Sequence, residues 1–283
     1  MLIAQITDFH LLAPGRLAYG TVDTRALVDR AFAKLGRLDP RPDLVVITGD
    51  VSDDGHPEAY THAASLLRGL NIPSLAVPGN HDAREPFRHF LEDLGGTCED
   101  DEFVLFAVDH GPLRFIGLDT VIPGEGGGAL CARRLSWLEA ILRREPRRPT
   151  LILAHHPPVP IGIDMMDDIR LREGAEDFEG IVAAHPQVLA LLCGHVHRAV
   201  ETLFGGRLCL LTPSIVHQVA LTLSPTTVAP AAVLEPPAFR LLRWDGARLA
   251  SHLAYVEEFG GPNPLAAPAL DASHSLDLAG SHR

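Results

Sequence analysis

Through about two-thirds of the chain, short apolar runs alternate with longer stretches whose apolar positions recur every three to four residues. The short runs predict strands, and the longer stretches predict amphipathic helices. Expected strands cover residues 2–7, 44–48, 74–77, 103–108, 113–118, 150–154 and 188–193. Expected helices begin near residue 24 and at residue 57, and cover residues 84–94, 133–144 and 173–184. This alternation predicts a layered α/β sandwich.

The pattern changes after residue 197. Four apolar runs at 200–204, 207–211, 239–244 and 249–255 predict consecutive antiparallel strands. We expect one domain over residues 1–259, in which residues 200–259 form a small β-rich cap, arm or oligomerisation region. Residues 224–237, rich in Pro, Ala and Thr, predict a surface loop or crossing arm. Residues 260–283 lack a core pattern and predict a mobile tail.

Five polar clusters each follow an expected strand. They are Asp8-Phe9-His10, Gly49-Asp50, Gly79-Asn80-His81-Asp82, His155-His156-Pro157-Pro158 and Gly194-His195-Val196-His197. Any one of them alone is compatible with a turn or a helix cap. In layered α/β folds, however, the carboxyl ends of strands line the crevice where ligands bind. Five such clusters therefore indicate one convergent site.

The side chains in these clusters are typical metal ligands. They offer two aspartates, one asparagine and several imidazoles, with no thiolate. Such a set suits Fe, Mn, Zn or Co and disfavours Mg and Ca, which prefer shells of oxygen ligands. Seven candidate ligands are too many for one four-coordinate ion. A site for two metal ions with a shared carboxylate accommodates all of them.

The ordered motifs D-x-H, G-D, G-N-H-D, H-H-P-P and G-H-x-H resemble those of the calcineurin-like metallophosphoesterase superfamily. Within it, the chain is most similar to bacterial class III cyclic-nucleotide phosphodiesterases and the related glycerophosphodiesterases. The motifs span residues 8–197, and the segments 19–23 and 214–218 also resemble the glycerophosphodiesterase branch. This resemblance implies a four-layer αββα sandwich with a dinuclear metal centre.

The resemblance also implies which residues bind each ion. One ion would be held by Asp8, His10, Asp50 and His197. The other would be held by Asp50, Asn80, His155 and His195, so that Asp50 bridges the two. In the H-H-P-P motif the family ligand is the first histidine, and His155 is therefore expected rather than His156.

Such a centre predicts hydrolysis by in-line attack of a metal-bound hydroxide, because metal binding lowers the pKa of water to about 7. Asp50 would act through the bridged ions, and His81 would stabilise or protonate the leaving alkoxide. Asn80 and His81 are expected to contact substrate. His217 and His156 are further candidates for substrate contact, although ordinary packing explains either residue equally well.

Charge and neighbouring residues narrow the substrate. With 24 basic and 36 acidic residues, the net charge of −12 argues against a nucleic-acid polymer as partner. Asp54 stands where related protein phosphatases carry a phosphate-clamping arginine, and Asp53 stands where purple acid phosphatases carry a tyrosine. A cavity without that cationic clamp favours a monoanionic diester over a dianionic monoester.

The substrate is therefore expected to be a small phosphodiester, either a glycerophosphodiester or a 3′,5′-cyclic nucleotide. The candidates for stacking on a base are Phe9, Tyr19, His81 and His217. Another hydrolase on the same centre (a nuclease, or an enzyme for pyrophosphates or phosphomonoesters) and a non-catalytic scaffold are the alternatives. A segment at residues 159–172 could form a lid, a dimer contact or a plain surface loop.

The chain carries no apolar run long enough to span a membrane and no signal-peptide pattern at its start. Its four cysteines form no CxxC pair. These observations predict a cytoplasmic enzyme without a membrane partner. The resemblance further implies a homo-oligomer, a dimer or a larger assembly.

Overall fold

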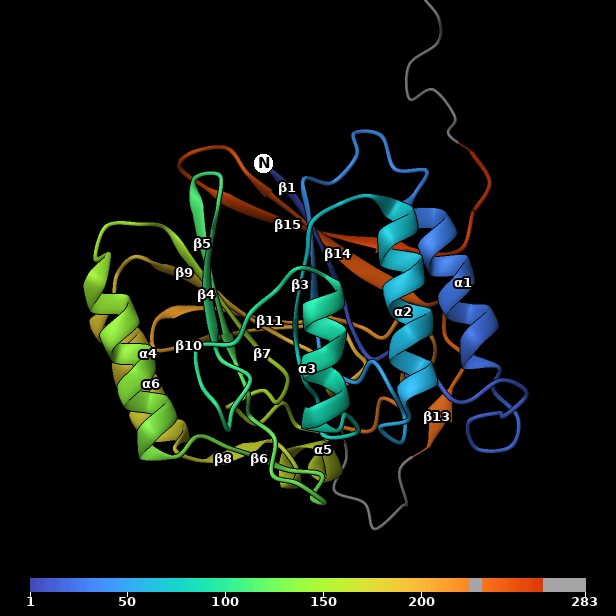
Figure 1. Cartoon of the computed structure of the whole chain (residues 1–283), viewed down its shortest axis with the longest axis horizontal. Coiled ribbons are helices and arrows are strands. Elements are labelled where there is room, and N and C mark those ends of the chain that lie inside the picture. The colour runs from blue at the N-terminus through green and yellow to red at the C-terminus, as the bar shows by residue number, and fades with distance from the viewer. Residues whose placement is uncertain (224–230, 262–283) are drawn as a thin grey trace, which may run out of the picture.

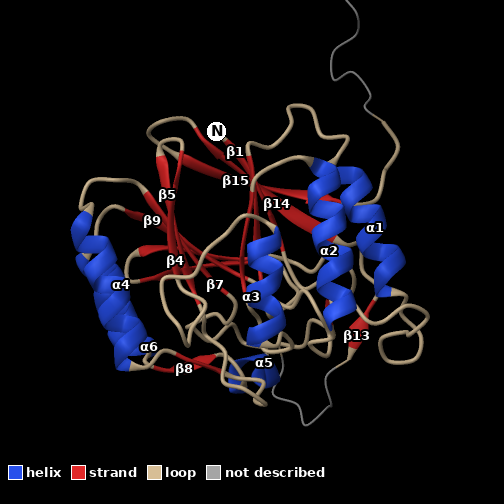
Figure 2. Cartoon of the chain, in the orientation of Figure 1, coloured by secondary structure: helices blue, strands red, loops and turns tan. Residues whose placement is uncertain are grey.

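The computed structural model describes residues 1–223 and 231–261. Two β-sheets pack face to face, and helices cover the outer face of each sheet (Figure 1 and Figure 2). The expected four-layer αββα fold is confirmed. The expected tail at residues 260–283 lies almost entirely outside the described residues, as does the first half of the expected loop at residues 224–237.

The first sheet lies beneath three helices. Its strand order is β15 (Leu249–Tyr255), β14 (Ala238–Trp244), β1 (Leu2–Ile6), β2 (Leu44–Thr48) and β3 (Ser74–Val77). The covering helices are α1 (Thr24–Leu35), α2 (Pro57–Leu70) and α3 (Arg84–Asp93). Strands β1, β2 and β3 run parallel, so their carboxyl ends meet at one edge of the sheet.

The second sheet lies beneath two long helices. Its strand order is β10 (Val200–Phe204), β11 (Arg207–Leu211), β9 (Val188–Cys193), β7 (Thr150–Ala154), β5 (Leu113–Leu118) and β4 (Phe106–His110). The covering helices are α4 (Ala132–Arg144) and α6 (Ala175–Ala184). Strands β5, β7, β9 and β11 run parallel, which brings a second set of carboxyl ends together.

Alternating side chains build the core between these layers. In β2, Val45 and Ile47 pack against the helices, whereas Val46 packs against the other sheet. In β7, Ile152 faces the helices of the second sheet, and Leu153 faces the first sheet. Because both faces of these strands are covered, they are apolar throughout instead of alternating with polar residues.

One helix and one strand differ from the sequence prediction by more than one residue at an end. The helix expected at residues 173–184 begins at Ala175, because β8 (Leu171–Glu173) pairs with β6 (Gly128–Ala129) just before it. The strand expected at 103–108 is shifted to β4, where it pairs with β5 in the expected hairpin. Strand pairing sets both boundaries, between distant segments for β8 and within the hairpin for β4.

The strands after residue 197 pair antiparallel as expected, but they do not form a sheet of their own. Strands β10 and β11 extend the second sheet, and β14 and β15 extend the first. Buried Arg240 on β14 joins the two edges, donating to Leu211 O at 3.0 Å and to Glu201 Oε1 at 2.8 Å. The expectation of a separate β-rich cap is therefore wrong for these four strands. A two-stranded ribbon of β12 (Gln218–Val219) and β13 (Ala232–Val233) lies outside both main sheets.

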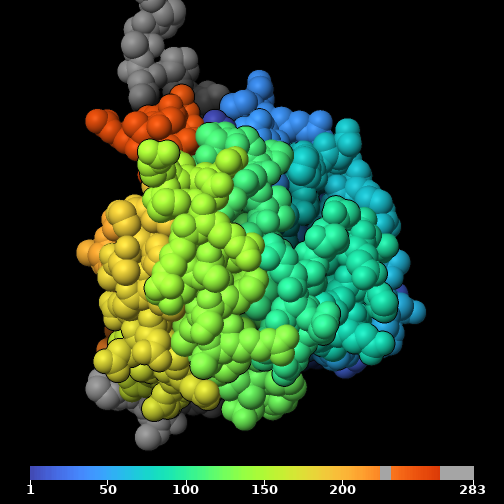
Figure 3. Space-filling model, turned by 60° about the vertical axis from the view of Figure 1, so that its left-hand side comes forward, coloured from blue at the N-terminus to red at the C-terminus, as the bar shows by residue number. Residues whose placement is uncertain are grey.

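The two halves of the sandwich also touch at the surface. The teal residues of α3 and its following segment lie beside the lime-green residues of α4 (Figure 3). Arg133 at the start of α4 forms an ion pair with Asp100, which follows α3, at 2.6 Å. Among the helices that the structure describes, none is long and apolar enough to cross a membrane.

The layer between the sheets is expected to carry much of the stability. Leu153→Ala removes a fully buried side chain from this layer and should lower the free energy of unfolding by about 2–5 kcal/mol. The matched change Leu203→Ala, at a side chain that is 64% exposed, should cost less than about 0.5 kcal/mol. Urea unfolding of both variants measures the difference, and equal losses would contradict this account of the core.

Candidate metal centre

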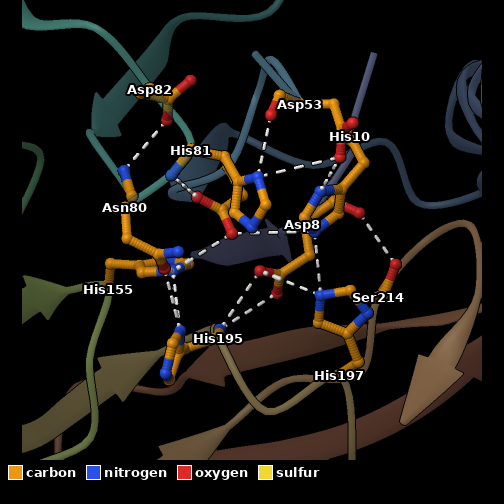
Figure 4. Close-up of polar contacts among 12 residues, drawn as sticks. Asp8, His10, Asp53, Asn80, His81, Asp82, His155, His195, His197 and Ser214 are labelled. Atoms are coloured by element: carbon orange, nitrogen blue, oxygen red, sulfur yellow. Dashed lines mark hydrogen bonds and ion pairs between the residues drawn. The ribbon is translucent and has the colours of Figure 1, made fainter. Parts of the chain in front are cut away.

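Seven candidate ligands converge where the parallel strands of both sheets end (Figure 4). The first sheet supplies residues that follow β1, β2 and β3, and the second sheet supplies residues that follow β7 and β9. The set is Asp8, His10, Asp50, Asn80, His155, His195 and His197. All of them except Asn80 are buried.

The backbone of this site is strained. Asp8, His10, Asp50, His195 and His197 all have positive φ angles, between 46° and 71°. A non-glycine residue in this region costs about 1–3 kcal/mol, and such residues concentrate at functional sites. The left-handed turns take each side chain from the end of its strand into a shared space. Five of the seven candidates therefore depend on conformations that packing must enforce.

Close approach requires glycine beside two of these residues. A Cβ at Gly49 would collide with the imidazole of His155, and a Cβ at Gly79 would collide with the carboxylate of Asp50. The G-D and G-N-H-D motifs thus combine a ligand with the space that neighbouring ligands need.

One group of ligand atoms gathers around His10. Its Nε2 lies 3.0 Å from His197 Nε2 and 3.6 Å from Asp50 Oδ2. Asp8 Oδ1 lies 3.5 Å from the same nitrogen of His197. Asp8, His10 and Asp50 offer ligand atoms that all lie within 4.8 Å of one another. These four residues are the expected ligands of the first ion.

A second group gathers around Asn80. Its Oδ1 lies 3.1 Å from His155 Nε2 and 3.0 Å from His195 Nδ1. These two nitrogens are 3.2 Å apart, and Asp50 Oδ2 lies 3.3 Å from His155 Nε2. The same oxygen of Asp50 therefore faces both groups, which suits a carboxylate that bridges two ions through one oxygen.

Each imidazole is oriented by a hydrogen bond from its other nitrogen. His155 Nδ1 donates to Thr48 O at 2.7 Å, and His197 Nδ1 donates to His217 O at 2.9 Å. His195 Nε2 donates to Ile169 O at 3.1 Å. His10 Nδ1 donates to a carboxylate oxygen of Asp53 at 2.9 Å. Such bonds fix which nitrogen faces inward, as is usual for histidines that bind metals.

The inward-facing atoms fit a cation. The nitrogens of His10 and His197 face each other, and Asn80 Oδ1 faces the nitrogens of His155 and His195. When the outer nitrogen of each imidazole carries the proton, the inner nitrogen carries a lone pair. In both ligand groups these lone pairs face one another or face the lone pairs of Asn80 Oδ1. A positive charge between them, whether a metal ion or a proton, removes that repulsion. The donor set is mixed nitrogen and oxygen, which suits a transition metal.

The pKa values of the ligand side chains in the metal-free protein also indicate that the site needs a positive charge. Burial lowers the pKa of the His155 imidazole, but the Asp50 carboxylate outweighs it and raises this pKa to about 9. Burial acts to raise the pKa of Asp50, yet the facing His155 holds it well below its usual value. Burial raises the pKa of Asp8 to about 6. A proton on His155 therefore supplies positive charge when no metal ion is bound.

His81 lies at the edge of the site. Its ring is 40% exposed and lines the cavity, and its Nδ1 donates to Asp53 O at 2.8 Å. Its backbone N–H donates to Asp50 Oδ1 at 2.9 Å. Asp82 does not touch the ring of His81. Instead it accepts hydrogen bonds from Gly79 N at 2.9 Å and Ser52 N at 3.0 Å, and thereby closes the turn.

The other two candidates for substrate contact, His217 and His156, differ in their position relative to the cavity. His217 lines the cavity, and its ring lies 4.8 Å from that of His197 while Nε2 is bonded to Tyr19 OH at 3.1 Å. His156 lies behind His195 and does not line the cavity. Its two ring nitrogens are bonded to Thr120 Oγ1 at 2.7 Å and Gly126 O at 3.1 Å. The geometry therefore supports a substrate contact for His217 and gives His156 a packing role.

A cavity of about 610 Å³ opens above the ligands. Its floor contains His10, Asp50, Asn80, His195 and His197, with His81, His217 and Tyr19 beside them. Of the expected stacking residues, Phe9 is absent from the cavity because it packs against Phe32 under α1, at 5.8 Å between ring centroids.

Sequence reasoning missed several contributors. Asp53 orients His10, a role that its position three residues after Asp50 does not indicate. The carbonyl groups of Thr48, Ile169 and His217 have no sequence signal, because every residue has one. Within the segment 159–172, the structure forms the short helix α5 (Asp164–Asp168), which puts Met165 and Met166 on the cavity wall.

Comparison with known proteins identifies the family. Residues 1–199 match the calcineurin-like phosphoesterases. The chain belongs to this family. Membership, together with the His and Asp clusters, implies that this phosphoesterase binds divalent metal ions. The family expected from the motifs is thereby confirmed.

Two curated relatives span nearly the whole of this phosphoesterase. The probable glycerophosphodiester phosphodiesterase GpdQ of Arcobacter nitrofigilis is 38% identical over 265 residues, which are 93% of this chain and 96% of that protein. The 3′,5′-cyclic adenosine monophosphate phosphodiesterase CpdA of Pseudomonas aeruginosa is 34% identical over 91% of each chain. A dimetal phosphatase from Danio rerio, at 18% identity, shares the fold with a TM-score of 0.69 over 91% of this chain and 96% of that one.

Metal binding by this phosphoesterase is expected to release a proton at neutral pH. The pKa of His155 is about 9 without metal, so the ring is protonated at pH 7 and the ion must displace that proton. Affinity should therefore rise with pH up to about 9, and protonation of Asp8 should weaken it further below about pH 6. Calorimetric titration with Mn²⁺ in buffers of different ionisation enthalpy measures the release. An affinity that does not change between pH 6 and 9 would contradict the assignment.

Neighbouring His155 and His156 give a matched pair. His155→Ala removes an inward-facing nitrogen and should lower the number of ions bound per chain. His156→Ala removes a ring bonded to Thr120 and Gly126, so it should lower thermal stability while keeping the metal content. Elemental analysis of both purified variants, with melting temperatures, distinguishes them. Equal metal loss in the two would show that the assignment to the first histidine is wrong.

Proposed function

We propose that this phosphoesterase hydrolyses small phosphodiesters at a centre of two metal ions drawn from Fe, Mn, Zn and Co. The observation that carries the proposal is the position of Asp50. Its Oδ2 lies 3.6 Å from a ring nitrogen of the first ligand group and 3.3 Å from one of the second. Two ions sharing this carboxylate would use every inward-facing donor. Bound ions supply the activation of water and the stabilisation of charge on phosphorus-bound oxygens.

Side chains of this protein would supply the remaining steps, which are proton donation to the leaving group and contact with the substrate. His81 is oriented by its Nδ1 hydrogen bond to Asp53 O, which leaves Nε2 as the nitrogen available to the leaving oxygen. In its protonated form, this ring donates a proton to the departing alkoxide. Asn80 belongs to the second group and also lines the cavity, so it contacts both metal and substrate. His217, bonded to Tyr19, also lines the cavity.

The cavity favours a diester over a monoester. Within residues 1–223 and 231–261, neither an arginine nor a lysine lines it. A dianionic monoester needs more compensating positive charge than a monoanionic diester does. The names of the relatives point the same way, since glycerophosphodiester and cyclic adenosine monophosphate phosphodiesterases both act on diesters. We therefore propose either of these two substrate types for this chain.

Two further expectations stay predictions. They are a cytoplasmic location and a homo-oligomeric state. Size-exclusion chromatography with light scattering measures the second of them directly.

Turnover by the metal-loaded protein tests the function. Enzyme reconstituted with Mn²⁺, Fe²⁺, Zn²⁺ or Co²⁺ should cleave 3′,5′-cyclic AMP, a glycerophosphodiester or bis-p-nitrophenyl phosphate faster than p-nitrophenyl phosphate. Absence of diester cleavage with every metal would refute the proposal. A strong preference for the monoester would refute the substrate argument.

His81 gives a sharper test of the mechanism. His81→Ala should lower kcat by about 10²–10⁴-fold, the usual contribution of a general acid, and should keep the metal content. The control His89→Ala changes an exposed histidine on α3, outside the cavity, and should leave kcat unchanged. The loss should shrink for substrates with an acidic leaving group such as p-nitrophenol, because that group needs no proton. An equal loss for all leaving groups would argue against proton donation.

A further inference from the structure

The cavity above the ligands has two unlike sides. Its floor is made of the ligand side chains and their polar neighbours, whereas the rest of its wall is apolar. We propose, resting on the proposed function, that this wall binds an uncharged apolar substituent of the diester and discriminates against cationic headgroups such as choline. This choice concerns the ester substituent of an acyclic diester.

One part of the wall comes from α5. Met165 and Met166 line the cavity together with Ile169, and Met166 is buried in the core of the second sheet. The carboxylate of Asp167 accepts hydrogen bonds from Ile161 N at 2.7 Å and Gly162 N at 2.9 Å, which holds the helix in place. The backbone of α5 is therefore held in place, and the flexible methionine side chains can adapt to apolar substituents of different shape.

The opposing part of the wall comes from the ribbon of β12 and β13. Val219 and Ala232 are paired across this ribbon, and Leu234 follows at the mouth of the cavity. Arg198 holds the ribbon by donating to Val219 O at 2.6 Å and to Glu235 Oε2 at 2.8 Å.

The arginines near the cavity are occupied elsewhere. Arg198 follows ligand His197 directly, but its guanidinium is bonded to the ribbon and does not line the cavity. Arg170 follows Ile169 and donates to Asp167 O at 2.6 Å. Arg16 pairs with Asp54 at 2.6 Å. The wall therefore gains no positive charge from any of the three.

Negative charge to hold a cation is also missing from this wall. In the described part of the chain, the ionisable groups that line the cavity are Asp50, the histidines and Tyr19, all of them at the floor or beside it. The three aspartates of α5 are not among the lining residues. Residues 224–230 contain no ionisable side chain. A carboxylate free to pair with an ammonium group is thus absent from the described wall.

An aromatic cage for a quaternary ammonium is absent as well. Tyr19 is the one phenol or phenyl ring that lines the described cavity, and it lies edge-on to His217, 5.2 Å away. Recognition of such cations by aromatic rings needs several faces around the charge. A buried ammonium would lose its water without compensation, whereas a tert-butyl group of the same shape would gain from burial.

An isosteric pair of substrates tests this inference. Glycerophosphocholine and the 3,3-dimethylbutyl ester of glycerol phosphate differ in charge at one atom. The metal-loaded enzyme should cleave the neutral ester with a kcat/KM about tenfold or more above that of the choline ester. Equal values, or a preference for choline, would overturn the inference. If neither ester nor any other diester is cleaved, the proposed function fails instead, so the two failures are distinguishable.

A charge placed in the wall should change this ratio. Met165→Glu puts a carboxylate beside the substituent and should shift the preference toward the choline ester by about tenfold or more relative to Met165→Gln. Leu203→Glu, at an exposed position of β10 outside the cavity, controls for added negative charge and should leave the ratio unchanged. Identical ratios for the two Met165 variants would show that the substituent does not bind this wall.

Discussion

The convergence of strand ends is the constraint on which the rest of this structure depends. Parallel pairing brings the carboxyl ends of β1, β2 and β3 to one edge, and the second sheet does the same for β7 and β9. Face-to-face packing of the two sheets then makes both edges line a single space. Donors from positions as distant as Asp8 and His197 meet there because the core is apolar and closely packed.

That convergence has a cost in backbone strain and in electrostatic repulsion. Five ligand candidates have left-handed backbone conformations, and several inward-facing atoms carry lone pairs directed at one another. The outer hydrogen bonds to Thr48 O, His217 O and Ile169 O keep the imidazoles in place despite this repulsion. The site is therefore preorganised for cations and stabilised by the sandwich around it, which is the usual relation between strain and function.

Two of the hydrogen bonds that orient the ligands link the centre to the substrate cavity. Ile169 O orients His195, and the side chain of Ile169 belongs to the apolar wall. His217 O orients His197, and the ring of His217 lines the cavity. Ile169 and His217 thus each orient a candidate metal ligand through the backbone and line the cavity through the side chain. A shift of either segment would change both functions together.

The amino-acid sequence alone is enough to predict the family, the alternation of strands and helices, and seven candidate ligands in order along the chain. It could do so because strand-end motifs such as G-N-H-D combine chemical identity with local turn geometry. The place of the last four strands depends on tertiary contacts, because β14 pairs with β1 across more than two hundred residues and buried Arg240 bonds to Leu211 and Glu201. The tertiary structure also shows that His217 lines the cavity whereas His156 does not, and it places Met165 on the cavity wall. Those choices depend on which surfaces meet, and no local pattern encodes contacts between distant parts of a chain.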